Sequence, residues 1–232
     1  MHLGELSRKS TGNTLSDTIL GGQDGLVNVL GVILGVAAAS NDPRIVIAGG
    51  LAATFAESIS MAAVALTSKM AERDHFVSEL EREKREIKEM PEKEEAEIRR
   101  VYKSKGFDGK ILDDITAHVM SSDKLWVDQM MKEELELKEV TQKEIYTSSF
   151  VVGIAALVGS FVPLTPFFFM PIQNAIWLAL AISAIVLFFV GLYKAKMTIG
   201  KPFKSGLQMV IIGMGAALAG YLIGRLFGVQ GV

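Results

Sequence analysis

The sequence contains no cysteine and only three histidines among its 232 residues. The absence of cysteine excludes a disulfide framework, an iron-sulfur cluster and any zinc site built from thiolates. A metal ion would therefore need carboxylate oxygen, thioether sulfur or backbone oxygen as its main ligands. The chain also lacks a basic excess, since its net charge is −2, and 50% of its residues are hydrophobic. This composition excludes a disordered protein, and we expect no nucleic-acid partner.

Charged residues are concentrated in one part of the chain. Residues 71–145 hold 21 of the 26 acidic residues and 15 of the 24 basic residues. Outside this charged segment, four long stretches are nearly free of charge: residues 19–39, 45–68, 148–193 and 205–229. This division predicts one part that lies in a membrane and one that lies in water.

The length of the uncharged stretches predicts how often the chain crosses the membrane. About 20 apolar residues in a helix span a ~30 Å hydrocarbon core. The stretch over residues 148–193 is long enough for two spans, and Pro163, Pro166 and Pro171 favour a tight reversal within it. We therefore predict an all-α membrane protein with five transmembrane helices, over about residues 19–39, 45–68, 148–165, 173–193 and 206–228.

Basic residues near the ends of the predicted spans indicate the orientation, because such residues are retained in the cytoplasm. They gather before the first span and between the last two, at Arg8, Lys9, Lys194, Lys196, Lys201 and Lys204. We expect a multi-pass protein of a cell membrane with a cytoplasmic N-terminus and charged segment and an external C-terminus. The first span is not interpreted as a signal peptide, because Asp24 interrupts it and a second span follows closely.

The charged segment predicts a helical domain between the second and third spans, which divides the chain into residues 1–70, 71–145 and 146–232. The second membrane helix is expected to continue into the cytoplasm until Pro91 ends it. Gly106 suits the residue after a helix, and Ser122 or Asp123 can cap the next one. Further helices are expected over about residues 92–103, 110–120 and from 124 towards 146.

Asp24 and Glu57 are acids within predicted spans, where an ionised side chain costs roughly 2.5 to 3.5 kcal/mol. Counting from the predicted cytoplasmic ends places Asp24 level with Met61 on the second span, with Glu57 one turn deeper on the face of Met61. A carboxylate beside a thioether suits a borderline divalent transition metal. The alternative is a protonated acid hydrogen-bonded to a neighbouring helix, with Met61 as ordinary packing.

Acids and methionines in the charged segment form a second candidate metal site. Glu83 and Glu86 share the i, i+3 spacing of Glu94 and Glu97, and the two pairs would face each other if the chain folds back at Pro91. Met130, Met131 and Glu134 fall within one helical turn and offer two soft sulfurs beside a carboxylate. Spacing alone favours the alternative of a solvated acidic face and methionines in a core.

Two other patterns carry less information. Rows of glycine at four-residue spacing, such as Gly21 with Gly25 and Gly31 with Gly35, allow close helix packing and would permit a dimer seam along the first span. Glu72 and His75 form one Glu-x-x-His pair, whereas ferritin-like di-iron sites need two.

Several motifs follow one another along the chain: Asp24-Gly25-Leu26, Ser58-Ile59-Ser60-Met61, Asp74-His75, the series Glu83, Glu86, Pro91, Glu94 and Glu97, and Trp126 followed by Met130-Met131. Together and in this order they resemble the vacuolar iron transporter family. The resemblance covers nearly the whole chain and is that of a prokaryotic homologue with a cytoplasmic metal-binding domain.

This resemblance implies a homodimeric exporter of Fe2+ in exchange for protons, with a path between the subunits. It implies Asp24 and Met61 as membrane ligands, and it implies as ligands of the cytoplasmic domain Glu83, Glu86, Glu94, Glu97, Met130, Met131 and Glu134. The chain departs from the family at Ala53, where members commonly carry a glutamate, and Glu57 stands one turn away as a substitute.

We therefore expect a non-enzymatic transporter that needs no cofactor and carries Fe2+, with Mn2+, Co2+, Ni2+ and Zn2+ as alternative ions of similar ligand preference. Its expected partners are the metal ions, protons, the lipid bilayer and a second copy of the chain. The rival hypothesis is a membrane-anchored ferroxidase or iron-storage protein, and a third is a metal sensor that gates a pore. A mere anchor would not need Asp24 or Glu57 in its spans.

Overall fold

The computed structural model describes residues 2–40, 42–197 and 200–228, with side chains from residue 14 onward. In this part the chain forms helices and turns and no strand. Five helices are long and apolar enough to cross a membrane. The predicted all-α membrane fold is thus confirmed. The side chains of Arg8 and Lys9 and the C-terminal residue, which entered the predicted orientation, lie outside the described part.

The five apolar helices are α1 (His2–Ala39), α2 (Pro43–Glu89), α6 (Gln142–Leu164), α7 (Ile172–Met197) and α8 (Pro202–Phe227). Each contains one of the predicted spans. As predicted, α2 runs without a break to the residue before the Met90–Pro91 turn, because nothing between its apolar and charged parts opposes helix. The predicted reversal after α6 is also present, as a short 3-10 helix, η2 (Thr165–Phe168).

The chain divides into two compact units. The first, called the bundle, comprises Met1–Leu66 and Tyr146–Val232, and the second, called the insert, comprises Thr67–Ile145. The helix α2 contributes its first part to the bundle and its last part to the insert.

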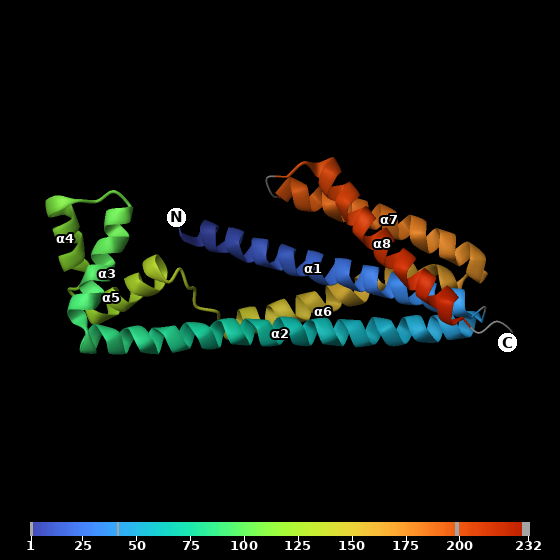
Figure 1. Cartoon of the computed structure of the whole chain (residues 1–232), viewed down its shortest axis with the longest axis horizontal. Coiled ribbons are helices and arrows are strands. Elements are labelled where there is room, and N and C mark those ends of the chain that lie inside the picture. Colours follow the sequence, from blue (N-terminus) through green and yellow to red (C-terminus); the bar gives the residue numbers. More distant parts are fainter. Residues whose placement is uncertain (1, 41, 198–199, 229–232) are drawn as a thin grey trace. The chain divides into compact units, whose positions relative to one another are not determined.

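Within the bundle, α1 is the central helix (Figure 1). It packs against α7 and α8, which also pack against each other. Its glycines contact α6, and its Ile33 lies close to Gly50 of α2. The helix α1 therefore contacts every other long helix of the bundle.

Glycines bring the backbones of the bundle into direct contact. A Cβ added at Gly25 would overlap a carbonyl of α6, and one added at Gly220 or Gly224 of α8 would overlap the carbonyl of Gly31 or Gly35. Such close approach is how helices associate in lipid. The glycine rows of α1 are therefore used for packing within the chain, and a dimer seam along the first span stays a prediction.

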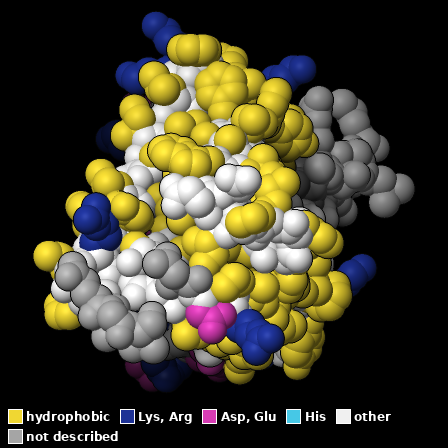
Figure 2. Space-filling view, turned by 90° about the vertical axis from the view of Figure 1, so that its right-hand side faces the viewer, with side chains coloured by type: hydrophobic (Ala, Val, Ile, Leu, Met, Phe, Trp, Pro, Cys, Tyr) yellow, Lys and Arg dark blue, Asp and Glu magenta, His cyan; other side chains and the backbone are white. Residues whose placement is uncertain are grey.

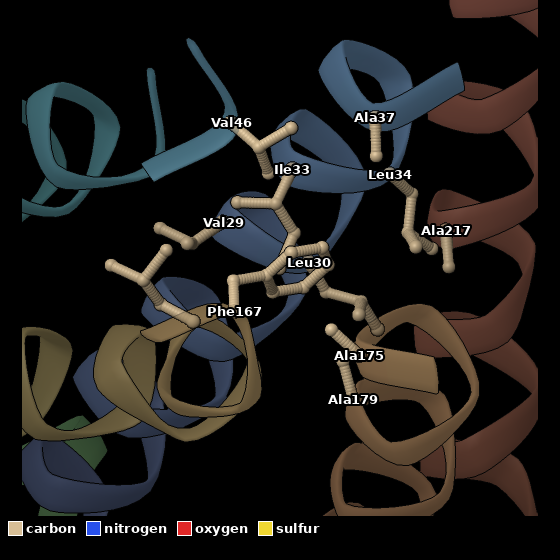
Figure 3. Close-up of a cluster of buried hydrophobic side chains, with 11 residues drawn as sticks. Val29, Leu30, Ile33, Leu34, Ala37, Val46, Phe167, Ala175, Ala179 and Ala217 are labelled. Carbon is tan, nitrogen blue, oxygen red and sulfur yellow. The ribbon is translucent and has the colours of Figure 1, made fainter. Parts of the chain in front are cut away.

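A hydrophobic cluster fills the space around the second half of α1 (Figure 3). Its members are fully or almost fully buried and come from all five helices and η2: Val29, Leu30, Ile33, Leu34, Ala37, Val46, Leu164, Phe167, Ala175, Ala179 and Ala217. The small alanines of α7 and α8 face the larger side chains of α1, which allows the helices to approach one another.

The outside of the bundle is apolar as well. Large hydrophobic side chains are exposed on each of its long helices, including Leu20, Ile59, Phe150, Phe189 and Ile211. Figure 2 shows one face on which hydrophobic side chains predominate and charged ones are few and scattered. A helix bundle that is apolar both in its core and on its surface suits contact with lipid.

The insert is a small helical domain with a core of its own. Besides the end of α2 it contains α3 (Pro91–Ser104), α4 (Gly109–Val119), α5 (Asp123–Gln129) and a π-helical turn, η1 (Met130–Glu134). Its buried core residues are Ile87, Ile98, Val119, Trp126, Val127, Met130 and Met131.

Local signals in the sequence account for most helix ends of the insert. Gly106 has φ +92°, a left-handed conformation that suits the residue after a helix end. The Asp108 side chain accepts a hydrogen bond from the backbone N–H of Gly109, and the Ser122 hydroxyl accepts one from that of Leu125. The predicted cap of the last helix is thus Ser122.

The predicted helix from residue 124 towards 146 is wrong. The chain leaves regular helix at the π-turn, where the N–H of Leu135 donates to Met130 and that of Leu137 donates to Met131. Glu136 then adopts a positive φ of 52°, which ends the helix. A new helix, α6, starts at Gln142 behind a reciprocal cap between Thr141 and Glu144.

Candidate metal sites

Asp24 and Glu57 lie side by side in the bundle. The carboxyl group of Asp24 on α1 is within hydrogen-bonding reach of that of Glu57 on α2. The amide of Asn28, one turn along α1, donates to Asp24 Oδ2 over 3.1 Å. Both acids are half-buried in the single chain. In the part that the structure describes, the groups acting on the Asp24 carboxyl include no lysine or arginine.

The sequence predicts that Asp24 and Met61 lie at the same depth in the membrane, and the observed pairing differs from that prediction. Because Glu57 faces Asp24, Met61 lies one turn further along α2, where it is half-buried. The expectation was counted from predicted span ends, and α1 and α2 both extend well beyond those ends. Helix ends were therefore a poor measure of depth.

Ala53 packs against the hydrophobic cluster of the bundle. Nearby hydroxyls of α2 are used by the helix itself, since Thr54 donates to the carbonyl of Gly50 and Ser58 donates to that of Thr54. Glu57 therefore provides the polar side chain on the face of α2 that lies against α1. That Glu57 substitutes for a glutamate at the position of Ala53 stays a prediction.

In the insert, acids from three elements converge. The chain folds back at Met90, so α3 lies along the end of α2 and the two predicted glutamate pairs come together. The acids are Glu79, Glu83 and Glu86 from α2, Glu94 and Glu97 from α3, and Glu134 from η1. Glu83 is 2% exposed and Glu94 is 0% exposed, which excludes the solvated face for these two.

Buried oxygens in this cluster lack hydrogen-bond donors. They are Glu83 Oε2, both carboxylate oxygens of Glu94, and Glu134 Oε2, among the described residues. A buried charged oxygen without a donor is costly. Such oxygens need either a proton or a cation.

The pKa values of two of these acids reflect that cost. Burial raises the pKa of Glu94 to about 7, and the negative charges of Glu97 and Glu83 add to the effect. Burial, with the same two charges, raises the pKa of Glu134 to about 7. By contrast, the Lys93 ammonium lowers the pKa of Glu86. Near neutral pH the cluster thus holds protons that a metal ion would have to displace.

Two basic side chains contact the cluster. Lys93 Nζ lies 3.1 Å from Glu86, 3.5 Å from Glu94 and 3.7 Å from Glu97. Arg82 contacts three acids of its own helix, at 2.8 Å from Glu79, 3.1 Å from Glu83 and 3.7 Å from Glu86.

Met130 and Met131 are 0% and 3% exposed and belong to the core of the insert. The prediction that both methionines pack in a core, which their spacing favoured, is therefore confirmed. The π-turn that holds them also holds Glu134, and such turns frequently occur at functional sites. A core position and a ligand role are compatible if a sulfur faces the acids.

No group of three acid or histidine side chains is set around a common point as it would be around a bound ion, within the described residues. Donor chemistry and converging charge support the two candidate sites. All the ligand roles remain proposals, namely those of Asp24, Glu57, Met61, Glu83, Glu86, Glu94, Glu97, Met130, Met131 and Glu134.

Sequence reasoning missed Glu79, Arg82 and Lys93. Glu79 lies outside the predicted glutamate pairs, but it pairs with Arg82 at 2.8 Å and its Oε2 is buried, as is Oε2 of Glu83. The i, i+4 spacing of Glu79 and Glu83 was the available signal. Lys93 directly precedes Glu94 in the sequence, and this position gave no indication that its side chain would turn back to α2.

The single Glu-x-x-His pair gathers no further ligands. Glu72 pairs with Lys69 at 2.7 Å, and His75 Nδ1 lies 4.0 Å from Glu79. These contacts are ordinary pairs on a helix surface.

The model of the VIT family matches residues 15–225 of the chain. The chain belongs to the VIT family. It is 29% identical to vacuolar iron transporter 1 of Tulipa gesneriana over 92% of this chain and 87% of that protein. It is 31% identical to vacuolar iron transporter 1 of Eucalyptus grandis, over 91% and 86%. The vacuolar iron transporter of Plasmodium falciparum is 31% identical, over 91% of this chain and 81% of its own length. The family predicted from the sequence motifs is thus confirmed.

Proposed function

We propose that the chain transports Fe2+ out of the cytoplasm through the bundle, in exchange for protons. Support comes from membership of a family whose relatives are named vacuolar iron transporters. It also comes from a bundle that keeps two acids together in apolar helices.

The observation that carries this proposal is the pair of Asp24 and Glu57. Two adjacent carboxyls in a span are costly when both are ionised. One bound divalent cation neutralises both charges, and a proton shared between them lowers the cost in its absence. Metal and proton therefore compete for the same two groups, which is the requirement for exchange.

Met61 is the proposed thioether ligand one turn along α2. A thioether is a weak ligand for Mg2+ and Ca2+ and suits transition metals. Asp24, Glu57 and Met61 thus favour Fe2+ over the abundant hard cations, with Mn2+, Co2+, Ni2+ and Zn2+ as further candidates.

The insert is proposed to collect metal ions on the cytoplasmic side. The ligands are Glu83, Glu86, Glu94, Glu97, Glu134 and, through sulfur, Met130 and Met131. Support comes from the buried carboxylate oxygens without donors, which a cation would satisfy.

A homodimer is also proposed. Its seam along α1 cannot use the glycine rows, which are packed against α6 and α8. The outward side chains of α1, such as Asn28 and Val32, remain for that contact.

Metal flux into proteoliposomes under an imposed pH gradient tests the proposal. We expect Fe2+ entry, measured anaerobically with a trapped chelating dye, to rise when the lumen is acidic and to be accompanied by alkalinisation of the lumen. Flux that is indifferent to the gradient would remove the exchange. Oxygen consumption on adding Fe2+ to the purified chain would instead favour the ferroxidase hypothesis.

A further inference from the structure

The position of Lys93 differs from that of the other paired lysines in the insert. Its ammonium lies within 4 Å of three carboxylates drawn from two helices, at 3.1, 3.5 and 3.7 Å. Lys84 contacts Glu81 on its own helix at 2.8 Å, and Lys105 pairs with Glu133. Among the lysines that form ion pairs in the described part of the insert, Lys93 alone bridges several proposed metal ligands.

The contacts of Lys93 are those that a metal ion would use. Its ammonium donates to Glu86 Oε2 and lies beside Glu94 Oε1, an oxygen that has no hydrogen-bond donor. An ammonium is a compact cation with three donors, so it can neutralise several carboxylates at one point.

Lys93 is also able to leave. Its side chain is 50% exposed, and a flexible four-carbon stem lets the ammonium move into water, where it is well hydrated. Glu94, in contrast, is fully buried, so its carboxyl group is confined by its neighbours. The counter-ion of the cluster thus has access to water, and its most buried acid does not.

We propose that Lys93 is a displaceable counter-ion, which holds the carboxylates of the insert together before metal binds and competes with the incoming divalent ion. Lys93 thereby lowers the affinity of the insert for metal and favours release. This inference rests on the proposed collecting role of the insert.

The physical reason is that the ammonium and a divalent ion compete for the same carboxylate oxygens. A metal ion that binds these oxygens displaces the Lys93 ammonium and leaves its positive charge near the bound ion. Removing that charge makes the electrostatic potential at the site more negative, so a divalent ion binds more tightly.

The first experiment is a Mn2+ titration of the full chain in detergent at pH 8, followed by the EPR signal of free Mn2+. The chain carries Asp24→Asn and Glu57→Gln, so that binding reports on the insert. We expect Lys93→Gln to tighten Mn2+ binding by about threefold to tenfold. Lys93→Arg should remain within about twofold of the parent because it keeps the charge.

Lys84→Gln is the matched control, because it also removes one lysine from the insert but one that pairs outside the cluster. It should change the affinity by less than about twofold. Unchanged or weaker Mn2+ binding in Lys93→Gln would overturn the inference while leaving metal collection intact. If the parent chain does not bind Mn2+ saturably, the collecting role fails and the inference fails with it.

A second experiment needs no substitution. Acetylation of lysines by acetic anhydride, measured by mass spectrometry, should increase several-fold at Lys93 when Mn2+ is added and stay constant at Lys84. Release from the three carboxylates frees the amine, which should make it more accessible to the reagent. Equal labelling of Lys93 with and without saturating Mn2+ would contradict displacement.

Discussion

The bundle and the insert hold their acids in opposite ways. In the bundle, the carboxyl groups of Asp24 and Glu57 face each other, and the groups acting on Asp24, among described residues, include no base. In the insert, buried acids are interleaved with Arg82 and Lys93. In the insert, Lys93 helps Glu86 to stay charged, while Glu94 and Glu134, with raised pKa values, hold protons near neutral pH. The bundle pair, without such neighbours, must take up a proton or a metal ion. The difference suits a holding site in the insert and a passage site in the bundle.

The largest expected effect is on the bundle acids. Asp24→Asn should reduce Fe2+ flux into proteoliposomes by at least about tenfold, because the amide cannot exchange a cation for a proton. Mn2+ binding by the insert should be unchanged. The control is Asp42→Asn, since Asp42 lies near the start of α2, where its side chain accepts from the N–H of Arg44 and an asparagine can do the same. An unchanged Fe2+ flux in Asp24→Asn would contradict the distinction between a holding site in the insert and a passage site in the bundle.

The reverse pattern is expected for the insert. Glu94→Gln should weaken Mn2+ binding there by about tenfold or more, because it removes a buried charged ligand. Glu92→Gln, on the exposed side of α3, should leave binding as it is. Equal affinities of the two variants by titration would show that the buried acids do not bind the ion.

The pH dependence of metal binding is the next effect in size. The folded-state pKa values of Glu94 and Glu134 are raised from 4.5 to about 7. The metal-free insert should therefore lose stability as the pH rises through this window, since the folded state binds more protons there. Metal affinity should increase by about tenfold or more between pH 6 and pH 8, with proton release. Calorimetry in buffers of different ionisation enthalpy measures this, and binding without proton release would contradict it.

A smaller effect separates the two roles of the insert methionines. Leucine has nearly the volume of methionine, so Met130→Leu and Met131→Leu should change the free energy of unfolding by less than about 1.5 kcal/mol. If sulfur binds the ion, Fe2+ affinity should fall by about threefold or more in at least one of them. Met120→Leu, which packs against the same core, is the control. Unchanged Fe2+ affinity in both variants would restrict Met130 and Met131 to packing.

The spans and most helix ends were predictable because they depend on local composition and on single residues. Pro91 ends α2, and Gly106 follows α3 with a positive φ. The break before α6 was also within reach, since Thr141 and Glu144 form an S/T-x-x-E cap in the sequence. The π-turn was not, because its backbone shift depends on how Met130 packs in the core.

The candidate sites were predictable by residue type more than by geometry. Asp24 of α1 lies beside Glu57 of α2, and this neighbour on another helix could not be read from the spacing of residues along either helix. Spacing found the glutamate pairs on α2 and α3, but it could not show that Lys93 bridges them. Contacts of a long, flexible side chain depend on the tertiary fold and leave no periodic signal.

The most direct test measures Fe2+ flux and Mn2+ binding by the insert on the same preparations of Asp24→Asn and Glu94→Gln. The account predicts opposite losses: Asp24→Asn binds Mn2+ at the insert but does not carry Fe2+, and Glu94→Gln binds Mn2+ weakly but still carries Fe2+ at high concentration. If Asp24→Asn carries Fe2+ at the rate of the unsubstituted chain, the ion does not pass the acids of the bundle, and the central claim is contradicted.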